Sequence, residues 1–517
     1  MNHRIRPLLL AAALVAAVPP FASQPPAKET PKAPSIQLRI QAETVHLPNG
    51  MTFILAPRPG APTFAGYVAF KVGGVDSVPG DTGLAHMFEH MAFKGTEHVG
   101  TKDWAHEKVI LEELQAAGDK LTMMKAEGSG TPEEVKALEE KVKDLSKQEK
   151  AFIVKDEFDL FYTRAGQRAL NANTGEDVTQ YFVSLPTNSL ELWMLLESQR
   201  IREPIMREFY SERDVIGQER LMRTENDPFG KLYEQFEATA FMAHPYRLPA
   251  IGWQSDIKAL RMKQAQDFFY AHYSPSNAVA VLVGNFDTAR AKVLIDKYFA
   301  TIPRRGDPPP IVTREPVQER ERRVQVVFDA NPQMLVGWHK PTWPSLDDTR
   351  LDVVSTILSD GVTSRLYKRL VEKDHLALDV STWNGDPGAR CDNLFVAQVT
   401  PNEGVPYATV EAALYDEIDK LKTDPVSAAE MDKAKTRILA SYLRRLDSTL
   451  STAMLLGSQH LITGDWQTIY KYIDDVQKVS AEDVRTAVKT YLSADNRTVA
   501  TLVKPAQPVT EKKEATP

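Results

Sequence analysis

The sequence predicts an α+β protein made of two homologous domains, each a mostly antiparallel sheet flanked by helices. Three observations predict this fold. Strand-like and helical patterns alternate along the chain, one helix–strand signature closes both halves, and a proline-rich passage separates them. With 517 residues, 43% of them hydrophobic and 25% charged, the chain is long enough for two sizeable cores.

The first residues have the pattern of a secretory signal peptide. Arg4 and Arg6 precede an apolar run from Leu8 to Val18 that is too short to span a membrane. We therefore expect a signal peptide at 1–23, with an uncleaved anchor as the alternative. A disordered lead-in at 24–35 follows. The expected mature protein is periplasmic or secreted and has no stable membrane span.

Composition excludes several classes of site. Cys391 is the only cysteine, so the chain has neither an internal disulfide nor a cysteine cluster for zinc. The net charge of -7 is spread along the sequence, and no basic face for nucleic acid stands out. The hydrophobic core must therefore hold the fold, even in an oxidising compartment.

The first domain is expected at 36–302 and begins with strands. Alternating or β-rich runs predict these strands at 37–40, 44–47, 51–55 and 65–72. Pro48-Asn-Gly separates the second run from the third and predicts a hairpin turn.

A charged helical hairpin is expected at about 104–158, inserted in the first domain. Two segments with helical spacing are separated by Glu127-Gly-Ser-Gly, and Thr131-Pro-Glu-Glu opens the second segment with a capping box. A protruding structural insertion is the simplest interpretation. An arm that contacts a partner or gates a substrate is the alternative.

The second domain is expected at 324–505, after an exposed linker at 303–323 and before a tail at 506–517. Its first elements are predicted as strands at 324–328 and 334–338 and a helix at 346–358.

An internal repeat links the two halves. Helical patterns at 262–272 and 481–490 are each followed by a tyrosine, a short polar stretch, Asn277 or Asn496, and an apolar strand. Chance could produce one such similarity, but its place at the end of both halves favours two copies of one domain.

The residues most suggestive of chemistry lie between Asp81 and Thr96. Apolar residues at helical spacing predict an amphipathic helix that Asp81 or Thr82 can cap and Gly95 can end. His86 and His90 then lie one turn apart on the same face, which suits two imidazoles converging on one cation.

Glu89 lies beside the two histidines, in the inverted pattern His-x-x-Glu-His. Its carboxylate can take a proton from a metal-bound water and return it to a leaving amine. A hydrolytic zinc also needs a third protein ligand and one open position. Glu212 and Glu219, seven residues apart on one predicted helix face, can supply a ligand and a second carboxylate that orients a histidine ring. A solvated charged face is the alternative.

Four motifs in order resemble the pitrilysin, insulinase and mitochondrial-processing-peptidase family of inverted zincins, over about residues 40–505. They are His-Met-Phe-Glu-His-Met-Ala-Phe-Lys-Gly-Thr at 86–96, Leu-Asn-Ala-Asn-Thr-Gly-Glu-Asp-Val-Thr-Gln-Tyr at 170–181, Glu-Arg-Asp-Val-Ile-Gly-Gln-Glu at 212–219 and Tyr-x-Pro-x-Asn at 273–277. The resemblance implies that Glu219 is the third zinc ligand and Glu212 the outer carboxylate. It also implies that Asn171 and Ala172 lie on an edge strand to which an extended peptide adds.

Two features depart from the family pattern. The interval from His90 to Glu219 is longer than usual by about the helical hairpin, which is expected to be inserted in a surface loop. In the second domain, Arg365 matches a substrate-binding arginine, but Leu378 stands where many members have a tyrosine that helps to stabilise the oxyanion. Tyr367 or another residue can substitute, or a second polypeptide can bring the pair.

The resemblance implies that half-length chains such as this one pair into a four-domain clamshell. We therefore expect a dimer, either of two copies or with a homologous subunit that supplies the arginine and tyrosine. The expected function is a zinc endopeptidase with one Zn²⁺ per chain on His86, His90 and Glu219, acting on unfolded peptides or small proteins. A peptide-binding scaffold subunit without catalysis is the main alternative. A structural zinc site fits less well, because such sites normally have four protein ligands.

Overall fold

The computed structural model describes residues 39–505 of the chain. The predicted signal peptide at 1–23, the lead-in at 24–35 and the tail at 506–517 lie outside the described residues.

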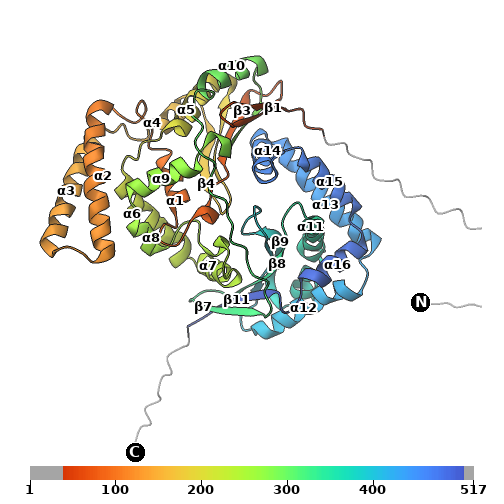
Figure 1. Cartoon of the computed structure of the whole chain (residues 1–517). Helices are drawn as coiled ribbons and strands as arrows, with labels where there is room; N and C mark the ends of the chain where they lie inside the picture. Colours follow the sequence, from red (N-terminus) through yellow and green to blue (C-terminus); the bar gives the residue numbers. More distant parts are fainter. Residues whose placement is uncertain (1–38, 506–517) are drawn as a thin grey trace, which may run out of the picture. The chain divides into compact units, whose positions relative to one another are not determined.

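The first half is built on a six-stranded sheet with the order β1-β2-β6-β3-β5-β4. Figure 1 labels β1, β3 and β4 of this sheet. Its strands are β1 Glu43–His46, β2 Thr52–Pro57, β3 Thr63–Phe70, β4 Arg168–Thr174, β5 Thr179–Pro186 and β6 Ala278–Gly284. β2 and β6 run parallel, and the other neighbours are antiparallel. The hairpin predicted around Pro48 is confirmed by the pairing of His46 with Thr52.

The strand predicted at 37–40 is wrong for its described part, because residues 39 and 40 lie in no strand. The backbone nitrogen and oxygen of Ile40 face the hydroxyl of Tyr470, at 2.9 and 3.4 Å. A side chain from the second half therefore takes the polar groups that a neighbouring strand would otherwise satisfy.

The second half repeats this arrangement on a five-stranded sheet with the order β7-β11-β8-β10-β9. Its strands are β7 Arg322–Val327, β8 Gln333–Lys340, β9 Ala377–Asp386, β10 Asn393–Pro401 and β11 Arg497–Val503. β7 and β11 are parallel as β2 and β6 are, and the remaining pairs are antiparallel. The predicted α+β fold with two homologous sheets is confirmed.

The two asparagines of the sequence repeat make the same contacts in both halves. The amide nitrogen of Asn277 donates to the carbonyl oxygens of Lys71 and His272, at 3.0 and 2.9 Å. That of Asn496 donates to the carbonyl oxygens of His339 and Tyr491, at 2.7 and 2.8 Å. Each asparagine thus joins the end of a helix to the sheet, which explains its place just before the last strand.

The helices of the first half include the predicted hairpin and a helix whose predicted bounds, 262–272, are confirmed. They are α1 Leu84–Met91, α2 Trp104–Glu127, α3 Pro132–Phe152, α4 Glu157–Arg164, α5 Leu190–Arg202, α6 Phe209–Arg220, α7 Pro228–Ala240, α8 Gln254–Ala259, α9 Met262–His272 and α10 Thr288–Tyr298. A π-helical turn, Leu221–Glu225, extends α6. The capping box at the start of α3 is also present, with Thr131 and Glu134 exchanging hydrogen bonds.

The second half is mostly helical outside its sheet. Its helices are α11 Leu346–Ser359, α12 Tyr407–Thr423, α13 Ala428–Asp447, α14 Thr449–Thr463, α15 Thr468–Lys478 and α16 Ala481–Tyr491, with a π-helical segment at Tyr367–Lys373. α14 packs on the first sheet, where Gly457 lets the ring of Tyr67 approach so closely that a Cβ would lie 2.2 Å from it. Across residues 39–505, no helix has the length and apolar character needed to cross a bilayer.

The helical hairpin is anchored to the rest of the first half along α2. Arg207 and Glu107 form an ion pair that is 1% and 0% exposed, and the same guanidinium donates to the carbonyl oxygens of Lys94, Thr96 and Val99. The hydroxyl of Tyr210 on α6 donates to Asp119 on α2 at 2.9 Å. Although inserted in the sequence, α2 therefore braces both α6 and the loop that follows α1.

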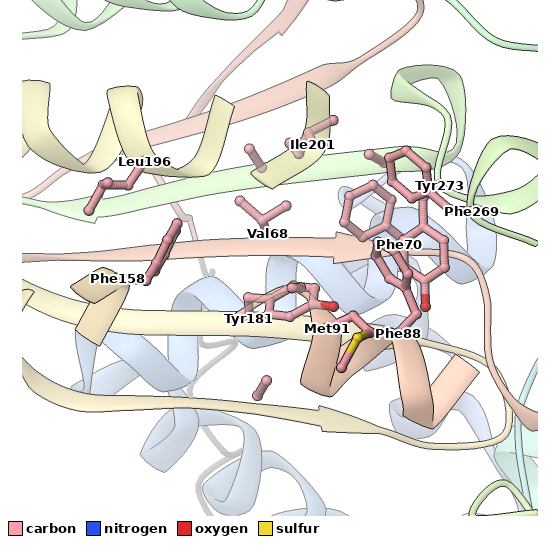
Figure 2. Close-up of a cluster of buried hydrophobic side chains, with 14 of the residues drawn as sticks. Val68, Phe70, Phe88, Met91, Phe158, Tyr181, Leu196, Ile201, Phe269 and Tyr273 are labelled. Carbon is pink, nitrogen blue, oxygen red and sulfur yellow. The ribbon is translucent and has the colours of Figure 1, made fainter. Parts of the chain in front are cut away.

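The aromatic core fixes the position of α1 (Figure 2). The ring of Phe88 stacks on Phe269 of α9 at 4.8 Å and lies 4.0 Å from Tyr273. Tyr273 in turn contacts Phe70 of β3 at 4.9 Å between ring centroids. Phe88 therefore ties α1 to α9 directly and to β3 through Tyr273.

Substitution Asn496→Ala should lower the free energy of unfolding by about 1–3 kcal/mol, because it leaves two carbonyl oxygens without their donor. Asn277→Ala should behave alike if the two residues are equivalent. Urea denaturation measures both. Asn188→Ala, at an exposed position, is the matched control, and equal midpoints for Asn496→Ala and Asn188→Ala would contradict the structural role.

Candidate metal and catalytic site

The helix that carries both histidines begins later than predicted. α1 starts at Leu84, after Gly83 with φ of 90°, and neither Asp81 nor Thr82 caps it. The hydroxyl of Thr82 instead accepts from the amide of Trp253 and donates to Asp256. The predicted cap is wrong because this tertiary contact takes the side chain that would have capped the helix.

His86, His90 and Glu219 come together at one point between α1 and α6. The Nε2 atoms of His86 and His90 lie 3.7 and 3.4 Å from the same carboxylate oxygen of Glu219, Oε2. All three ligand atoms lie within 4.8 Å of one another. Ligands about 2.0–2.1 Å from a tetrahedral zinc lie roughly 3.4 Å apart, so two imidazoles and one carboxylate at these distances fit zinc.

Burial and neighbouring charges perturb both imidazoles. Burial and, less strongly, the nearby His90 together lower the pKa of His86 to about 4. Burial would also lower the pKa of His90, but hydrogen bonds to Glu212 and Glu219 raise it to about 9. A cation between these groups would take the place of the proton that His90 otherwise holds.

Glu212 lies on the outer side of His90. Its Oε1 is 2.9 Å from Nδ1 of His90, and its Oε2 is 2.6 Å from the ammonium of Lys94. Burial alone would raise its pKa, but the bonds to His90 and Lys94 lower the pKa of Glu212 to about 2. A carboxylate on Nδ1 fixes the ring so that Nε2 points at Glu219, which is the arrangement that orients metal-bound histidines.

Glu89 points toward the first sheet and accepts a hydrogen bond from the hydroxyl of Thr174, at 2.7 Å between the oxygens. Burial raises the pKa of Glu89 above its ordinary value, and the bond from Thr174 opposes that rise. Sequence reasoning did not assign a role to Thr174. Its only sequence signal was its place in the 170–181 motif, two residues after Ala172.

Asn171 and Ala172 lie on β4, which within residues 39–505 pairs with β5 alone and forms an edge of the sheet. Thr174 ends the same strand, so this edge leads to Glu89. The other predicted substrate residue, Arg365, lies elsewhere. Its guanidinium pairs with Glu430 on α13 at 2.9 Å, and Leu378 on edge strand β9 is 62% exposed. The structure thus groups five predicted residues at α1 and α6, places two on the adjoining edge, and leaves Arg365 within the second half.

Comparison with protein families matches residues 259–438 to the family described as Peptidase M16 inactive domain. The matched range begins after Glu219, so it does not include the histidines or glutamates of the site.

Comparisons over longer stretches point to zinc proteases. The zinc protease PqqE of Helicobacter pylori is 26% identical over 471 residues, which cover 90% of this chain and 93% of that protein. The crystal structure of a protease from Helicobacter pylori has a TM-score of 0.75 at 25% identity and matches 90% of this chain and 99% of that chain. The first half of the periplasmic protease PqqL from Escherichia coli shares the fold, with a TM-score of 0.64 at 16% identity over 89% and 92% of the chains.

Substitution Glu212→Gln should weaken zinc binding by about 10–100-fold, because His90 loses the carboxylate that fixes its ring. Competition with a chelator measures the change. Glu208→Gln is the matched control, since Glu208 also pairs with Lys94, at 3.3 Å, whereas Nδ1 of His90 is bonded to Glu212. Equal zinc affinity in the two variants would show that Glu212 does not orient the ligand.

Proposed function

From the membership of this chain in the M16, or pitrilysin, family of peptidases, we propose that it is a zinc-dependent endopeptidase that cleaves unfolded peptides or small proteins. The single observation that carries the proposal is the convergence of His86, His90 and Glu219 beside the carboxylate of Glu89. Sequence similarity to a zinc protease over 90% of the chain supports it.

His86, His90 and Glu219 would hold one zinc ion per chain. When bound, zinc would act as a Lewis acid that polarises the scissile carbonyl and makes water a better nucleophile near neutral pH. The three side chains provide two nitrogens and one oxygen, which leaves a position free in a tetrahedral site, as hydrolytic sites require.

Glu89 would act as the general base and acid. Its carboxylate accepts a proton from the attacking water and returns it to the leaving amine, and its burial brings its pKa closer to the range in which both transfers are easy. The hydrogen bond from Thr174 holds one carboxylate oxygen, Oε2, and leaves the other for the proton.

The substrate would bind as an added strand along β4. Asn171 and Ala172 would offer main-chain hydrogen bonds there, and an extended chain in this register runs toward Glu89 at the end of the strand. A folded protein does not present such a strand, which is why an unfolded peptide is the proposed substrate.

Export to the periplasm or beyond and assembly into a dimer complete the proposal. Arg365 pairs with Glu430, and Leu378 stands where the family tyrosine is expected, so in this proposal a homologous second subunit can bring the arginine and tyrosine pair to the site. A peptide-binding subunit without catalysis is the alternative that the following measurements separate.

Substitution Glu89→Gln should lower kcat by at least about 10²–10⁴-fold while zinc stays bound, because the amide cannot accept a proton. Peptide cleavage and metal content are measured on the same sample. Full activity in the variant would remove Glu89 from the mechanism. No cleavage by the zinc-loaded wild-type chain, alone or with a co-expressed homologue, would favour the alternative.

Dilution should lower the specific activity if two subunits complete the site, because the dimer dissociates by mass action. Light scattering across the same concentrations reports the mass. A monomer with constant specific activity would contradict the dimer proposal.

A further inference from the structure

The turn between β4 and β5, residues 175–178, lies next to the catalytic carboxylate and is held by another loop of the first half. The amide of Gly74 donates to the carbonyl oxygen of Gly175 at 3.1 Å, and that of Val75 donates to the carbonyl oxygen of Glu176 at 2.9 Å. The turn begins directly after Thr174, so its position decides where the Thr174 hydroxyl lies.

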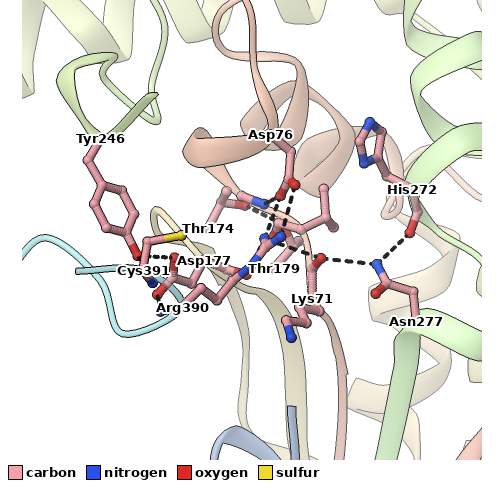
Figure 3. Close-up of polar contacts among 12 residues, drawn as sticks. Lys71, Asp76, Thr174, Asp177, Thr179, Tyr246, His272, Asn277, Arg390 and Cys391 are labelled. Atoms are coloured by element: carbon pink, nitrogen blue, oxygen red, sulfur yellow. Dashed lines mark hydrogen bonds and ion pairs between the residues drawn. The ribbon is translucent and has the colours of Figure 1, made fainter. Parts of the chain in front are cut away.

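A loop of the second half that contains Ala389 and Arg390 forms hydrogen bonds with the same turn (Figure 3). The carboxylate of Asp177 accepts from the amides of Ala389 and Arg390 and from the hydroxyl of Tyr246, the last two at 3.0 and 2.8 Å. Gly388 lies so close that a Cβ there would be 2.4 Å from the Asp177 carboxylate. The loop and the turn are therefore in close contact, so a shift of one would press on the other.

The guanidinium of Arg390 forms an ion pair with Asp76, in the loop that also holds the turn. It donates to both carboxylate oxygens of Asp76, at 2.7 and 3.1 Å, and Nη1 also lies 3.4 Å from the carbonyl oxygens of Lys71 and Asp177. The side chains of Arg390 and Asp76 are 11% and 1% exposed. A buried two-pronged ion pair has a well-defined geometry, and its loss leaves the Asp76 carboxylate with the Gly73 amide as a donor but without its cationic partner.

We infer that Arg390 is a positioning residue for catalysis: from the second half it fixes the 175–178 turn and thereby holds Thr174 against Glu89. This inference rests on the proposed function, in which Glu89 transfers the protons. It gives the half without metal ligands an indirect part in the reaction, through a contact within one chain. Arg390 acts on the orientation of the base and does not touch the substrate or the metal.

The test compares Arg390→Met with Arg58→Met in the full-length, zinc-loaded protein. Arg58 also joins the two halves, donating to the carbonyl oxygen of Leu446 and the hydroxyl of Thr452 at 2.9 Å each, but it does not touch the turn. Arg390→Met should lower kcat by about 10–100-fold with KM and zinc content close to those of the wild type. Arg58→Met should keep the wild-type kcat, and Arg390→Lys should recover part of the loss.

A double-mutant cycle tests the route through Thr174. If Arg390 acts by holding Thr174, the double variant Thr174→Val/Arg390→Met should be no slower than Thr174→Val alone. Fully additive losses would overturn the inference. Should Arg390→Met fail to fold, Asp177→Asn replaces it in the cycle with the same expectation, because it weakens the grip on the turn and keeps the side chain's size.

Hydrogen exchange gives a readout that does not depend on cleavage. Amides in residues 170–180 should exchange faster in Arg390→Met than in the wild type, while Arg58→Met should leave them unchanged. Unchanged exchange and an unchanged kcat in Arg390→Met would overturn the inference even if the wild type is an active peptidase. A wild type without activity would instead refute the proposed function, and the exchange rates would still decide whether Arg390 holds the turn.

Discussion

Two helices from distant parts of the chain have to bring three polar side chains to one point in a buried setting. His86 and His90 come from one turn of α1, and Glu219 comes from α6. Side chains of this kind are costly to bury unless they are paired with one another or with a cation. The aromatic packing of Phe88 against Phe269 and Tyr273 sets the position of α1, and α2 braces α6 from outside.

The two halves of the chain share one scaffold, but the candidate metal site lies in the first half. Both halves place a strand between two neighbours, one parallel and one antiparallel, and use an asparagine to join a helix end to the sheet. The scaffold is therefore shared, whereas the histidines and glutamates belong to the first half alone. The second half contributes through contacts at the boundary, such as Arg390 on Asp76 and Gly457 against Tyr67.

Local sequence patterns predicted helices and strands well where a single capping residue, turn or hydrophobic periodicity determines where the element begins or ends. The bounds of α9, the capping box at Thr131 and the hairpin after β1 follow from such patterns, and the structure confirms them. The cap predicted at Thr82 is wrong because Asp256 and Trp253, far along the chain, bond its hydroxyl instead. The strand predicted at 37–40 is wrong in its described residues, 39 and 40, for a similar reason, since Tyr470 bonds the backbone of Ile40.

In the candidate site too, local patterns predicted some residues, whereas others depend on contacts between distant parts of the chain. The spacing of His86 and His90 could be predicted from helix geometry, and Glu219 was one of two acids on a predicted face. Thr174 and Arg390 could not be found in this way, because their roles depend on how β4, its turn and the second half fit together. The family resemblance predicted that Arg365 binds the substrate, but in the structure its guanidinium pairs with Glu430.

The most direct measurement of the central claim is anomalous diffraction at the zinc edge from crystals of the purified protein, together with its metal content. The account predicts one zinc per chain, within about 2.0–2.2 Å of Nε2 of His86, Nε2 of His90 and a carboxylate oxygen of Glu219. Zinc bound at a different place, or a protein that takes up no zinc when it is supplied in excess, would contradict it.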